Sequence, residues 1–439
     1  MTHPASDPID QHLLAAMRQT DTAATRSRFP SLHSPASALK SPTQKAEVPV
    51  LIFGSGLTAL GVLRSFRFAG ITAYSVCPQD ELPVKSRWYR RPPLNGIGPP
   101  APEDLSAYLE SSPLDRAVLV PCSDDWTRAI AELPDKFKDR FPASVACPRV
   151  VQIMTDKWLF ASMLEVLDIP RPRTLLLHSM EEMAKLDDES YRDMFLKPLD
   201  SQEFARQYRV KAFQLKGRAH ALEIMARLQH NGRDGFPILL QEYIPGPTSH
   251  YYLVDGFSDR RNCIRALIAR RRLSQYPPHF GNSSRSQTIP LDQVGGAIES
   301  LTKMWSTLQY RGIFDAEFKY DARDGRLKIL EVNARPWWFV EFATRCGVDL
   351  CGMAYADALG LPVEPVETYD VGRCCVHLSY DLAAHWATDP GIGGFLRWLR
   401  SCKNVEDIFY RWDDPWPGVT SMFSSLRTYL RRVLRPQAD

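Results

Sequence analysis

The chain lacks the features that mark secreted, disulfide-bonded or membrane-spanning proteins. Its nine cysteines include no C-x-x-C pair, and the one close pair is Cys374-Cys375, so neither a zinc framework nor a disulfide scaffold is predicted. No apolar run approaches the roughly 18 residues that a membrane span needs. The N-terminus has no signal-peptide core, because Asp7, Asp10 and Asp21 interrupt it. We therefore expect a soluble cytoplasmic protein with reduced thiols.

Charge of one sign and nucleophile motifs are also missing. The net charge is only +3, which is too balanced to favour a nucleic-acid partner. Neither G-x-S-x-G nor H-E-x-x-H occurs, so no hydrolase nucleophile or zinc protease site is predicted. What remains is an ordinary globular composition, 44% apolar and 24% charged, in a chain of 439 residues. This length predicts two or three domains.

The first third of the sequence predicts a tail followed by a small α/β layer. Residues 1–46 are rich in Ser, Thr, Pro and Ala, which is typical of a flexible segment. From Val48, VPVLIFGSGLTALGVLRSFRFAGITAYSVC predicts a strand, a glycine turn, a helix and a second strand. The apolar runs AVLVP, from Ala117, and SVACP, from Ser144, predict further parallel strands.

After Arg149 the pattern changes. MTDKWLFASMLEVLDIPRPRTLLL predicts a helix and then a strand, and MFLKP and PILLQEYIPG predict two more strands. We expect a strand over 264–272, a helix from Ile298, and a helix over 340–361. The last 75 or so residues contain Trp residues and the basic run SLRTYLRRVLRP. They predict either a docked helical cap whose aromatic residues complete the core or a membrane-surface helix.

Between those helices, FDAEFKYDARDGRLKILEVNARPWW predicts a polar β-hairpin. The Asp324-Gly325 dipeptide is a strong turn signal, and pairing across it sets Glu317 beside Glu331. Because side chains alternate along a strand, Glu331, Asn333 and Arg335 share one face. Two carboxylates and an amide oxygen suit Mg²⁺, although a polar outer face of an amphipathic hairpin would have the same pattern.

Three other patterns have both a functional and a structural reading. Gly54 to Ala59 (GSGLTA) fits a relaxed dinucleotide fingerprint or a tight turn without a cofactor. Lys157 and Lys197 could contact phosphate oxygens or be surface lysines. The run Gln241-Glu242-Tyr243-Ile244 before a Pro-Gly turn can offer backbone groups to an adenine edge, or it is an ordinary strand end. Five arginines lie close together in the sequence: Arg265, Arg270, Arg271, Arg272 and Arg285. They predict either a clamp for an anionic ligand or a strand edge protected by charge.

Taken in order, TDKW, IPRP, FLKP, QEYIPG, AEFKYD and LEVNARP resemble the motifs of the ATP-grasp superfamily over roughly Val48 to Val363. Within it, QYPPHFG, GVDL and DDPWPG are similar to the carbamoyl-phosphate-synthase-like carboxylate–amine ligases, a subgroup that includes D-aspartate ligase. The resemblance implies a multidomain α/β and α+β protein. A small parallel-sheet pre-ATP-grasp domain (47–150) precedes a two-lobed ATP-grasp fold (151–364, lobes about 151–240 and 241–364). A C-terminal helical extension (365–439) follows.

The resemblance also implies roles for the singled-out residues. Lys157 and Lys197 would contact ATP phosphates, and Gln241, Glu242, Tyr243 and Ile244 would surround the adenine. Glu317, Glu331 and Asn333 would hold two Mg²⁺ ions, with Mn²⁺ as a possible substitute. Arg335 would steady the transferred phosphoryl group or the substrate carboxylate. ATP, a carboxylate and an amine are the expected partners, and a homodimer is a possible assembly.

The sequence departs from the family in two places. No glycine-rich loop is evident between Lys197 and Gln241, and Ser201, Gln202 and Lys211 are candidates for part of its role. After IPG, PTSHYY stands where many members place a ribose-binding acid. The expected reaction is acylphosphate formation followed by amine attack. The alternatives are a bicarbonate-dependent carboxylase or carbamoyl-type enzyme, a decayed nucleotide-binding scaffold, and a dinucleotide-dependent oxidoreductase.

Overall fold

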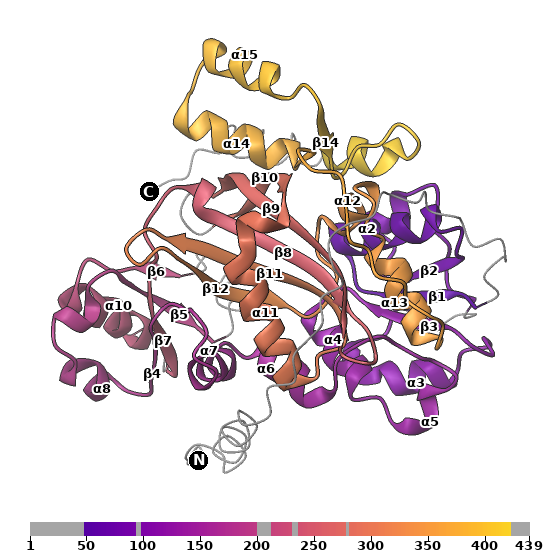
Figure 1. Ribbon diagram of the computed structural model, residues 1–439, viewed down its shortest axis with the longest axis horizontal. Coiled ribbons are helices and arrows are strands. Elements are labelled where there is room, and N and C mark those ends of the chain that lie inside the picture. The colour runs from indigo at the N-terminus through magenta and orange to yellow at the C-terminus, as the bar shows by residue number, and fades with distance from the viewer. Residues whose placement is uncertain (1–47, 94–97, 200–211, 231–235, 278–280, 423–439) are drawn as a thin grey trace.

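The computed structural model describes residues 48–93, 98–199, 212–230, 236–277 and 281–422 (Figure 1). Its strands form an N-terminal sheet, a small sheet and a large sheet. The tail prediction for 1–46 and the candidates Ser201, Gln202 and Lys211 lie outside the described residues.

The N-terminal sheet is parallel, with the strand order β2-β1-β3. Its strands are β1 (Val50–Phe53), β2 (Ala73–Val76) and β3 (Val118–Pro121). The strand predicted at SVACP is wrong: residues 144–147 form no strand, and the isolated parallel bridge from Leu119 ends at Ala143, just before them. The helices of this part are α2 (Gly56–Phe68), α3 (Leu105–Glu110), α4 (Asp124–Ala131), α5 (Asp135–Lys138), η2 (Leu82–Lys85) and η3 (Pro102–Asp104).

The small sheet has the order β4-β7-β5-β6, and all of its pairs are antiparallel. Its strands are β4 (Thr174–Leu177), β5 (Met194–Pro198), β6 (Phe213–Gln214) and β7 (Ile238–Glu242). The single helix predicted before β4 is two helices, because Asp156 ends the first and caps the second with its side chain. The helices are α6 (Pro148–Thr155), α7 (Lys157–Val166), α8 (Met180–Lys185), η4 (Glu189–Tyr191) and α10 (Arg218–His230).

The large sheet has the strand order β12-β11-β8-β9-β10-β13-β14. Its first five strands are β12 (Arg326–Asn333), β11 (Gly312–Asp321), β8 (Tyr251–Ser258), β9 (Ile264–Tyr276) and β10 (Asn282–Ile289). Helix α11 (Gly295–Leu308) covers one face, and its buried Trp305 and Leu301 share a core with Phe314 and Phe318 of β11. The short helices η5 (Thr248–His250) and η6 (Leu291–Val294) flank β8 and α11.

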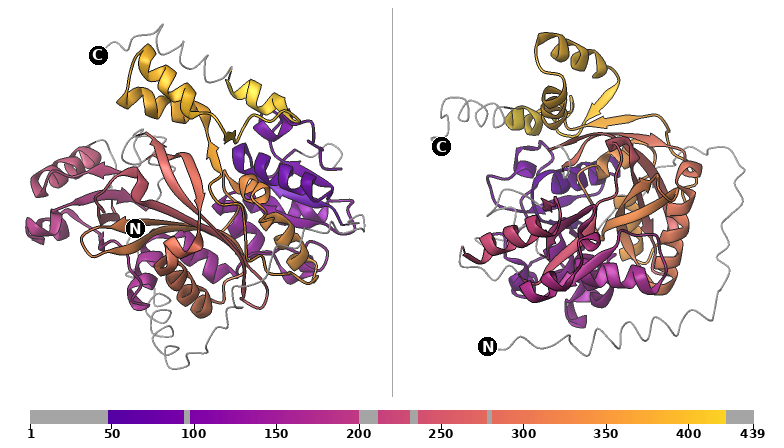
Figure 2. Two further views of the ribbon diagram at one scale, coloured as in Figure 1. Left: turned by 45° about the horizontal axis from the view of Figure 1, so that its top comes forward. Right: turned by 90° about the vertical axis from the view of Figure 1, so that its left-hand side faces the viewer.

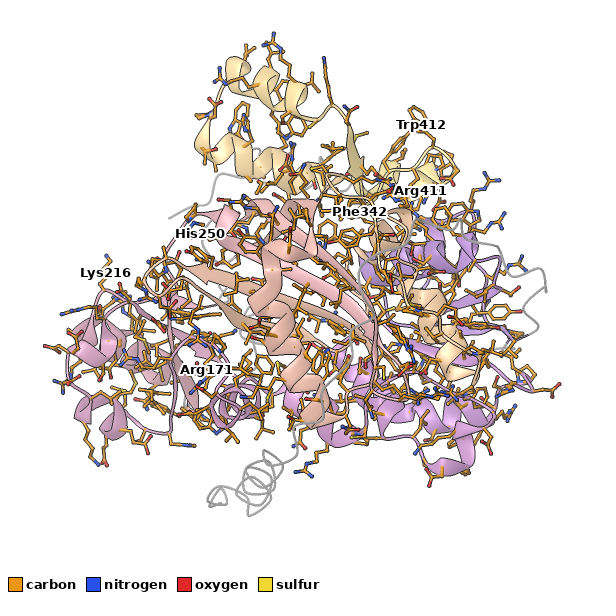
Figure 3. All side chains as sticks on the ribbon, in the orientation of Figure 1. Arg171, Lys216, His250, Phe342, Arg411 and Trp412 are labelled. Atoms are coloured by element: carbon orange, nitrogen blue, oxygen red, sulfur yellow. The ribbon has the colours of Figure 1, made fainter. Side chains whose placement is uncertain are left out.

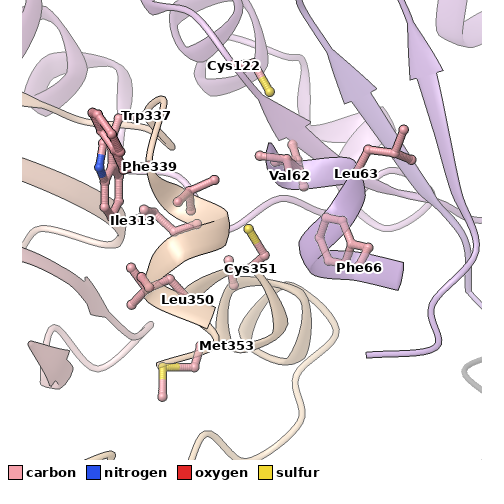
Figure 4. Packing of buried hydrophobic residues seen from close by; sticks show 14 of the residues in the cluster. Val62, Leu63, Phe66, Cys122, Ile313, Trp337, Phe339, Leu350, Cys351 and Met353 are labelled. Atoms are coloured by element: carbon pink, nitrogen blue, oxygen red, sulfur yellow. The ribbon is translucent and has the colours of Figure 1, made fainter. Parts of the chain in front are cut away.

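The helix predicted over 340–361 is interrupted. It is α12 (Val340–Arg345) and α13 (Leu350–Ala358), and Gly347 has φ +99° between them. These helices pack against α2, so the N-terminal sheet and the large sheet share one core (Figure 4). Val62, Leu63 and Phe66 of α2 belong to the same buried cluster as Leu350.

The C-terminal segment adds strands as well as helices. β13 (Cys374–Val376) pairs with β10 and β14 (Val405–Asp407) pairs with β13, while α14 (Leu378–Thr388) and α15 (Ile392–Ser401) stand above this edge of the large sheet (Figure 2). The expectation that its aromatic residues complete the core holds in part: Trp398 is 8% exposed, and Tyr369 and Phe409 pack against the core that the two sheets share. It is wrong for Trp386, Trp412 and Trp416, which are 50%, 89% and 62% exposed.

A buried arginine joins the beginning of the described chain to its end. Arg64 on α2 is fully buried and donates from Nε to Asp414 at 3.0 Å. It also donates to Glu341 of α12 at 3.4 Å and to the carbonyl oxygens of Ile408 and Phe409. Each donor therefore has a partner, as a charge at this depth requires.

Candidate active site

The β11–β12 hairpin aligns the predicted carboxylates as the sequence indicates. Glu317 lies directly opposite Glu331, and Asp315 lies opposite Asn333, with a bulge just after Glu317. Glu331 is exposed, whereas Glu317 and Asn333 are half-buried. Two carboxylates and an amide oxygen therefore face outward from one end of the hairpin.

Beneath them, a buried charged layer fixes the direction of the Asn333 amide. Asn333 Nδ2 donates to Asp315 at 2.9 Å, and its amide oxygen lies 3.1 Å from Arg335 Nη2, from which it accepts. Arg270, 1% exposed, donates to both oxygens of Asp255 at 2.5 and 3.0 Å and reaches Asp315 at 3.4 Å. Burial, and then the neighbouring Asp255, raise the pKa of Asp315 well above its usual range. Asp315 thus acts as a buried acceptor that orients a candidate metal ligand.

Glu317 has a cation of its own. Arg272 of β9 donates to it at 2.5 Å and to Ser283 at 2.7 Å, and its guanidinium lies 4.3 Å from the Tyr251 ring centroid. Burial raises the pKa of Glu317, and Glu331 raises it further, while Arg272 opposes both effects. A second cation at this position would relieve the remaining repulsion between the two carboxylates.

The five-arginine cluster is mostly paired. Arg265, Arg270, Arg272 and Arg285 each contact a carboxylate, on Asp259, Asp255, Glu317 and Asp381 respectively. Arg271 instead donates to the carbonyl oxygen of Ser249 at 2.7 Å. The arrangement therefore fits structural ion pairing better than a shared anion clamp.

Arg335 is held by a residue from the N-terminal sheet. Its Nε donates to Asp124 at the start of α4 at 2.7 Å, and its Nη2 donates to Asn333 Oδ1 at 3.1 Å. Its Nη1 donates to the carbonyl oxygen of Pro336 at 3.2 Å. The predicted proximity of Arg335 to Asn333 is confirmed, whereas the contact with Asp124 was not predicted.

Of the two predicted lysines, Lys197 lies on β5 and Lys157 contacts the backbone at the end of that strand. Lys157, the first residue of α7, donates to the carbonyl oxygen of Pro198 at 2.8 Å and also to that of Leu199. Lys197 is half-buried on the same strand. Both lysines therefore belong to the small-sheet side of the molecule, and the carboxylates belong to the large sheet.

The segment Gln241–Ile244 connects these two sides. The N–H of Glu242 donates to the carbonyl oxygen of Arg173 at 2.8 Å, and that of Tyr243 donates to Asp193 at 2.6 Å. The N–H of Ile244 makes no hydrogen bond to any residue that the structure describes. The carboxylate of Glu242 accepts from Arg323 in the β11–β12 turn. The N–H of Ile244 is thus able to donate a hydrogen bond to the edge of a ligand such as adenine.

A cavity of about 640 Å³ opens beside this segment. Its wall includes Tyr243, the 246–248 turn, Lys319 on β11 and residues of α14 and α15. Figure 3 shows His250, just beyond that turn, at the end of the large sheet nearer the small sheet. The cavity is therefore lined by the segment Gln241–Ile244, by β11 of the hairpin and by the C-terminal helices α14 and α15.

Lys319 was not singled out from the sequence. It is 2% exposed, and its Nζ lies 3.3 Å from the Tyr251 hydroxyl, 4.4 Å from that ring's centroid and 4.7 Å from the centroid of Tyr243. Burial lowers its pKa to about 8. Strand alternation could have revealed it, because Lys319 stands two residues after Glu317 and shares its face.

In the glycine turn at Gly54, the backbone donor that would face a cofactor phosphate already has a protein partner. The N–H of Gly56, at the start of α2, donates to the Glu81 carboxylate at 3.1 Å. Gly54 has φ +124°, and a Cβ there would lie 2.9 Å from Cβ of Cys122. These contacts favour the tight-turn reading over the dinucleotide site.

Two features are absent from the residues that the structure describes. No cluster of three or more His, Cys, Asp or Glu side chains is placed to hold a metal ion there, so the hairpin set depends on Asn333 as its third ligand. In the same residues, no helix has the length and apolar character needed to cross a membrane.

Comparison with known proteins agrees with the motifs. No protein-family model matches the chain. The chain is 23% identical over 328 residues to a D-aspartate ligase from Enterococcus faecium (strain Aus0004), covering 71% of this chain and 76% of that protein. It is also 22% identical over 229 residues to the carbamoyl phosphate synthase large chain of Methanothrix thermoacetophila, covering 50% of this chain and 18% of that protein.

Solved structures show the same architecture. N5-carboxyaminoimidazole synthetase from Staphylococcus aureus matches with a TM-score of 0.56 and 12% identity, over 75% of this chain and 82% of that chain. L-amino acid ligase from Bacillus licheniformis matches with a TM-score of 0.52 and 15% identity, over 74% and 76%. These matches show that the chain shares its fold with these two solved structures, as the order of its motifs predicted.

Proposed function

We propose that the protein uses ATP and Mg²⁺ to activate a carboxylate as an acylphosphate and to couple it to an amine. The observation that carries this proposal is the register of the hairpin, with Glu317 opposite Glu331 and with Asn333 oriented by Asp315. The D-aspartate ligase match favours an amino-acid-like substrate. In this proposal the functional divisions are 47–150, 151–240, 241–364 and 365–439.

The donor set fits a hard cation. The carboxylates of Glu317 and Glu331 and the amide oxygen of Asn333 would hold Mg²⁺, or Mn²⁺ in its place, and two ions could share Glu331. The bound metal would neutralise charge on phosphate oxygens during transfer. Arg272 already contacts Glu317, so this side chain is held in place before any ligand arrives.

The residues of the chain then have separate tasks. The N–H of Ile244 and the nearby Tyr243 would meet the adenine, and Lys157 and Lys197 would bind the phosphates. Arg335 would orient the oxygen atoms of the acid or of the γ-phosphoryl group. The acid oxygen forms a bond to the γ-phosphorus as the bond to ADP breaks, and the amine later displaces phosphate from the acyl carbon. Such transfer depends mainly on position and charge, so no protein nucleophile is needed.

The remaining attributes are proposals of the same kind. The nine cysteines form no disulfide in the structure, where all nine are free thiols, which is compatible with a cytoplasmic location. A homodimer is proposed on the family resemblance alone. Sedimentation of the purified full-length chain over a range of concentrations would test it.

The test of the activity is turnover. The purified chain, MgATP and a library of carboxylic acids and amines should release ADP and phosphate in a manner that requires both substrates. Chelation should abolish release, and added Mg²⁺ or Mn²⁺ should restore it. Glu331→Gln should reduce turnover by at least about 100-fold, because it removes a carboxylate that would hold Mg²⁺. Glu110→Gln is the control, since Glu110 forms an exposed pair with Lys136.

The outcomes separate the alternatives. Release that depends on bicarbonate in place of the acid would indicate the carboxylase or carbamoyl-type reaction. ATP binding without turnover across the library, with Glu331→Gln unchanged in cells, would indicate a scaffold. Binding of a nicotinamide cofactor, detected by a fluorescence titration, would indicate the oxidoreductase. Absence of both ATP binding and turnover would overturn the proposal.

A further inference from the structure

Asp124 lies far from the hairpin in sequence, on a helix that follows the N-terminal sheet, yet it contacts the side chain proposed to face the reacting atoms. It is the first residue of α4, immediately after β3, and its side chain is 35% exposed. Its Oδ1 accepts from Arg335 Nε at 2.7 Å, and its Oδ2 lies 3.5 Å from Nη2. The carboxylate therefore meets two nitrogen atoms on one edge of the guanidinium, the geometry that fixes both its direction and its rotation.

The other contacts of Arg335 complete the orientation. Nη2 also donates to Asn333, and Nη1 donates to the carbonyl oxygen of Pro336. A guanidinium has five N–H groups, so one N–H on Nη1 makes no hydrogen bond to any residue within the described ranges. The orientation of the Arg335 guanidinium is thus fixed, and one N–H group remains to donate to an oxygen atom of a ligand.

The local structure around Asp124 holds it in place. Ser123 caps α4, its hydroxyl accepting from the N–H of Trp126 at 3.3 Å. Gly54 lies so close to Cys122 that a Cβ there would be 2.9 Å from the cysteine Cβ. The 122–124 turn therefore packs directly against the glycine turn after β1. The glycine turn, read from the sequence as a possible cofactor site, instead supports the segment that presents Asp124.

We propose that Asp124 is a positioning residue for Arg335, through which the N-terminal sheet takes part in the phosphoryl-transfer step. This inference rests on the proposed function, because it assigns to Arg335 a contact with the transferred group or the acid. The carboxylate keeps the guanidinium rotated toward that group. Without it, the charge remains but the guanidinium loses the partner of its Nε edge and is held only by Asn333 and the Pro336 carbonyl oxygen.

The test compares two adjacent aspartates. Asp124→Asn keeps the size of the side chain but removes the charge, and misplacement of an orienting group should lower kcat by about 100-fold. The KM for ATP should stay unchanged, because Asp124 does not contact the nucleotide segment. Asp125→Asn is the matched control, since Asp125 forms a surface pair with Arg128 at 3.4 Å. Asp124→Glu should recover part of the lost turnover.

A double-mutant cycle distinguishes positioning from a general structural effect. Arg335→Lys keeps the charge but cannot form the fork, so adding Asp124→Asn to it should cause little further loss. Additive losses would overturn the proposal, as would a kcat for Asp124→Asn equal to that of Asp125→Asn. A fall in melting temperature with unchanged kcat would also overturn it.

One measurement needs no turnover. In the unsubstituted chain labelled with ¹⁵N-arginine, the Nε–H of Arg335 should exchange slowly with solvent, because it is held by Asp124. Rapid exchange would overturn the pair itself, even if Asp124→Asn fails to fold. If the unsubstituted chain shows slow exchange but no ATP-dependent turnover, the proposed function fails and the proposed role of Asp124 in transfer fails with it. Slow exchange with turnover unaffected by Asp124→Asn overturns the positioning role alone.

Discussion

Replacing Lys319 with methionine should stabilise the protein while weakening its hold on ATP. Lys319 is 2% exposed and lies beside two tyrosine rings, and its Nζ has a hydroxyl but no carboxylate within hydrogen-bond distance among the described residues. Burial lowers its pKa from 10.5 to about 8, and this difference corresponds to about 3 kcal/mol of destabilisation by the buried charge. Methionine fills similar space without that charge.

The pH dependence follows from the two pKa values. Below about pH 8 both the folded and the unfolded chain carry the charge, so Lys319→Met should raise the free energy of unfolding by at most about 3 kcal/mol. Between about pH 8 and 10.5 the unfolded chain binds more protons than the folded chain, so the advantage should shrink and then vanish. Urea unfolding at pH 7 and at pH 10.5 measures both values.

The control and the binding assay complete the test. Lys328→Met on β12 removes a lysine that contacts the buried Asp321 at 2.6 Å, so it should destabilise the protein. Lys319 lines the cavity beside Tyr243, where the nucleotide is proposed to bind, so its ammonium group would be placed to donate to the nucleotide. Calorimetric titration with MgATP should then show about tenfold weaker binding to Lys319→Met. The reasoning is refuted if Lys319→Met is less stable than the unsubstituted chain at pH 7, or if its advantage persists at pH 10.5.

Two further predictions concern stability. Asp349 caps α13 through the N–H of Gly352, and burial raises its pKa from 3.8 to about 6, so Asp349→Asn should keep the cap and add about 3 kcal/mol above pH 6. Between about pH 6 and 4 the folded chain binds a proton at Asp349 that the unfolded chain does not, so this gain in stability should disappear as the pH falls toward 4. Thermal melts across that range would measure the loss. A gain that does not change with pH would contradict the raised pKa of Asp349. Gly54→Ala should destabilise by about 1–3 kcal/mol, since φ is +124° and the new methyl would meet Cys122, whereas Gly98→Ala, with nothing within 4 Å, should melt like the unsubstituted chain.

The hairpin was predictable because its signals are local. Alternation and the Asp324-Gly325 turn fix which residues share a face, and β11 pairs with β12 in the expected register. The strand before the Pro-Gly turn was readable from its apolar run, whereas β8, the strand after that turn, was not predicted. Local pattern failed at SVACP and across Gly347. SVACP has the composition of a strand but forms none, since the bridge to Leu119 is made by the preceding Ala143. Gly347 interrupts an otherwise helical pattern.

The contact that orients the Arg335 side chain was not predictable from the sequence. Asp124 and Arg335 are separated by 211 positions, and no short-range pattern links a helix start in one sheet to the end of a hairpin in another. Lys319 could have been found, since its alternation with Glu317 is visible in the sequence. The strands β13 and β14 have three residues each and gain their conformation from pairing at the edge of the large sheet.

The buried Arg64 has a consequence for synthesis on the ribosome. Its side-chain partners Glu341 and Asp414 stand 277 and 350 positions later in the chain. At translation rates of about 5–20 residues per second, helix α2 waits on the order of tens of seconds before those partners emerge. The first sheet to be made is therefore among the last to reach its final state. Until then, a nascent chain carries an arginine that must stay hydrated, and premature burial of α2 is disfavoured until the C-terminus arrives.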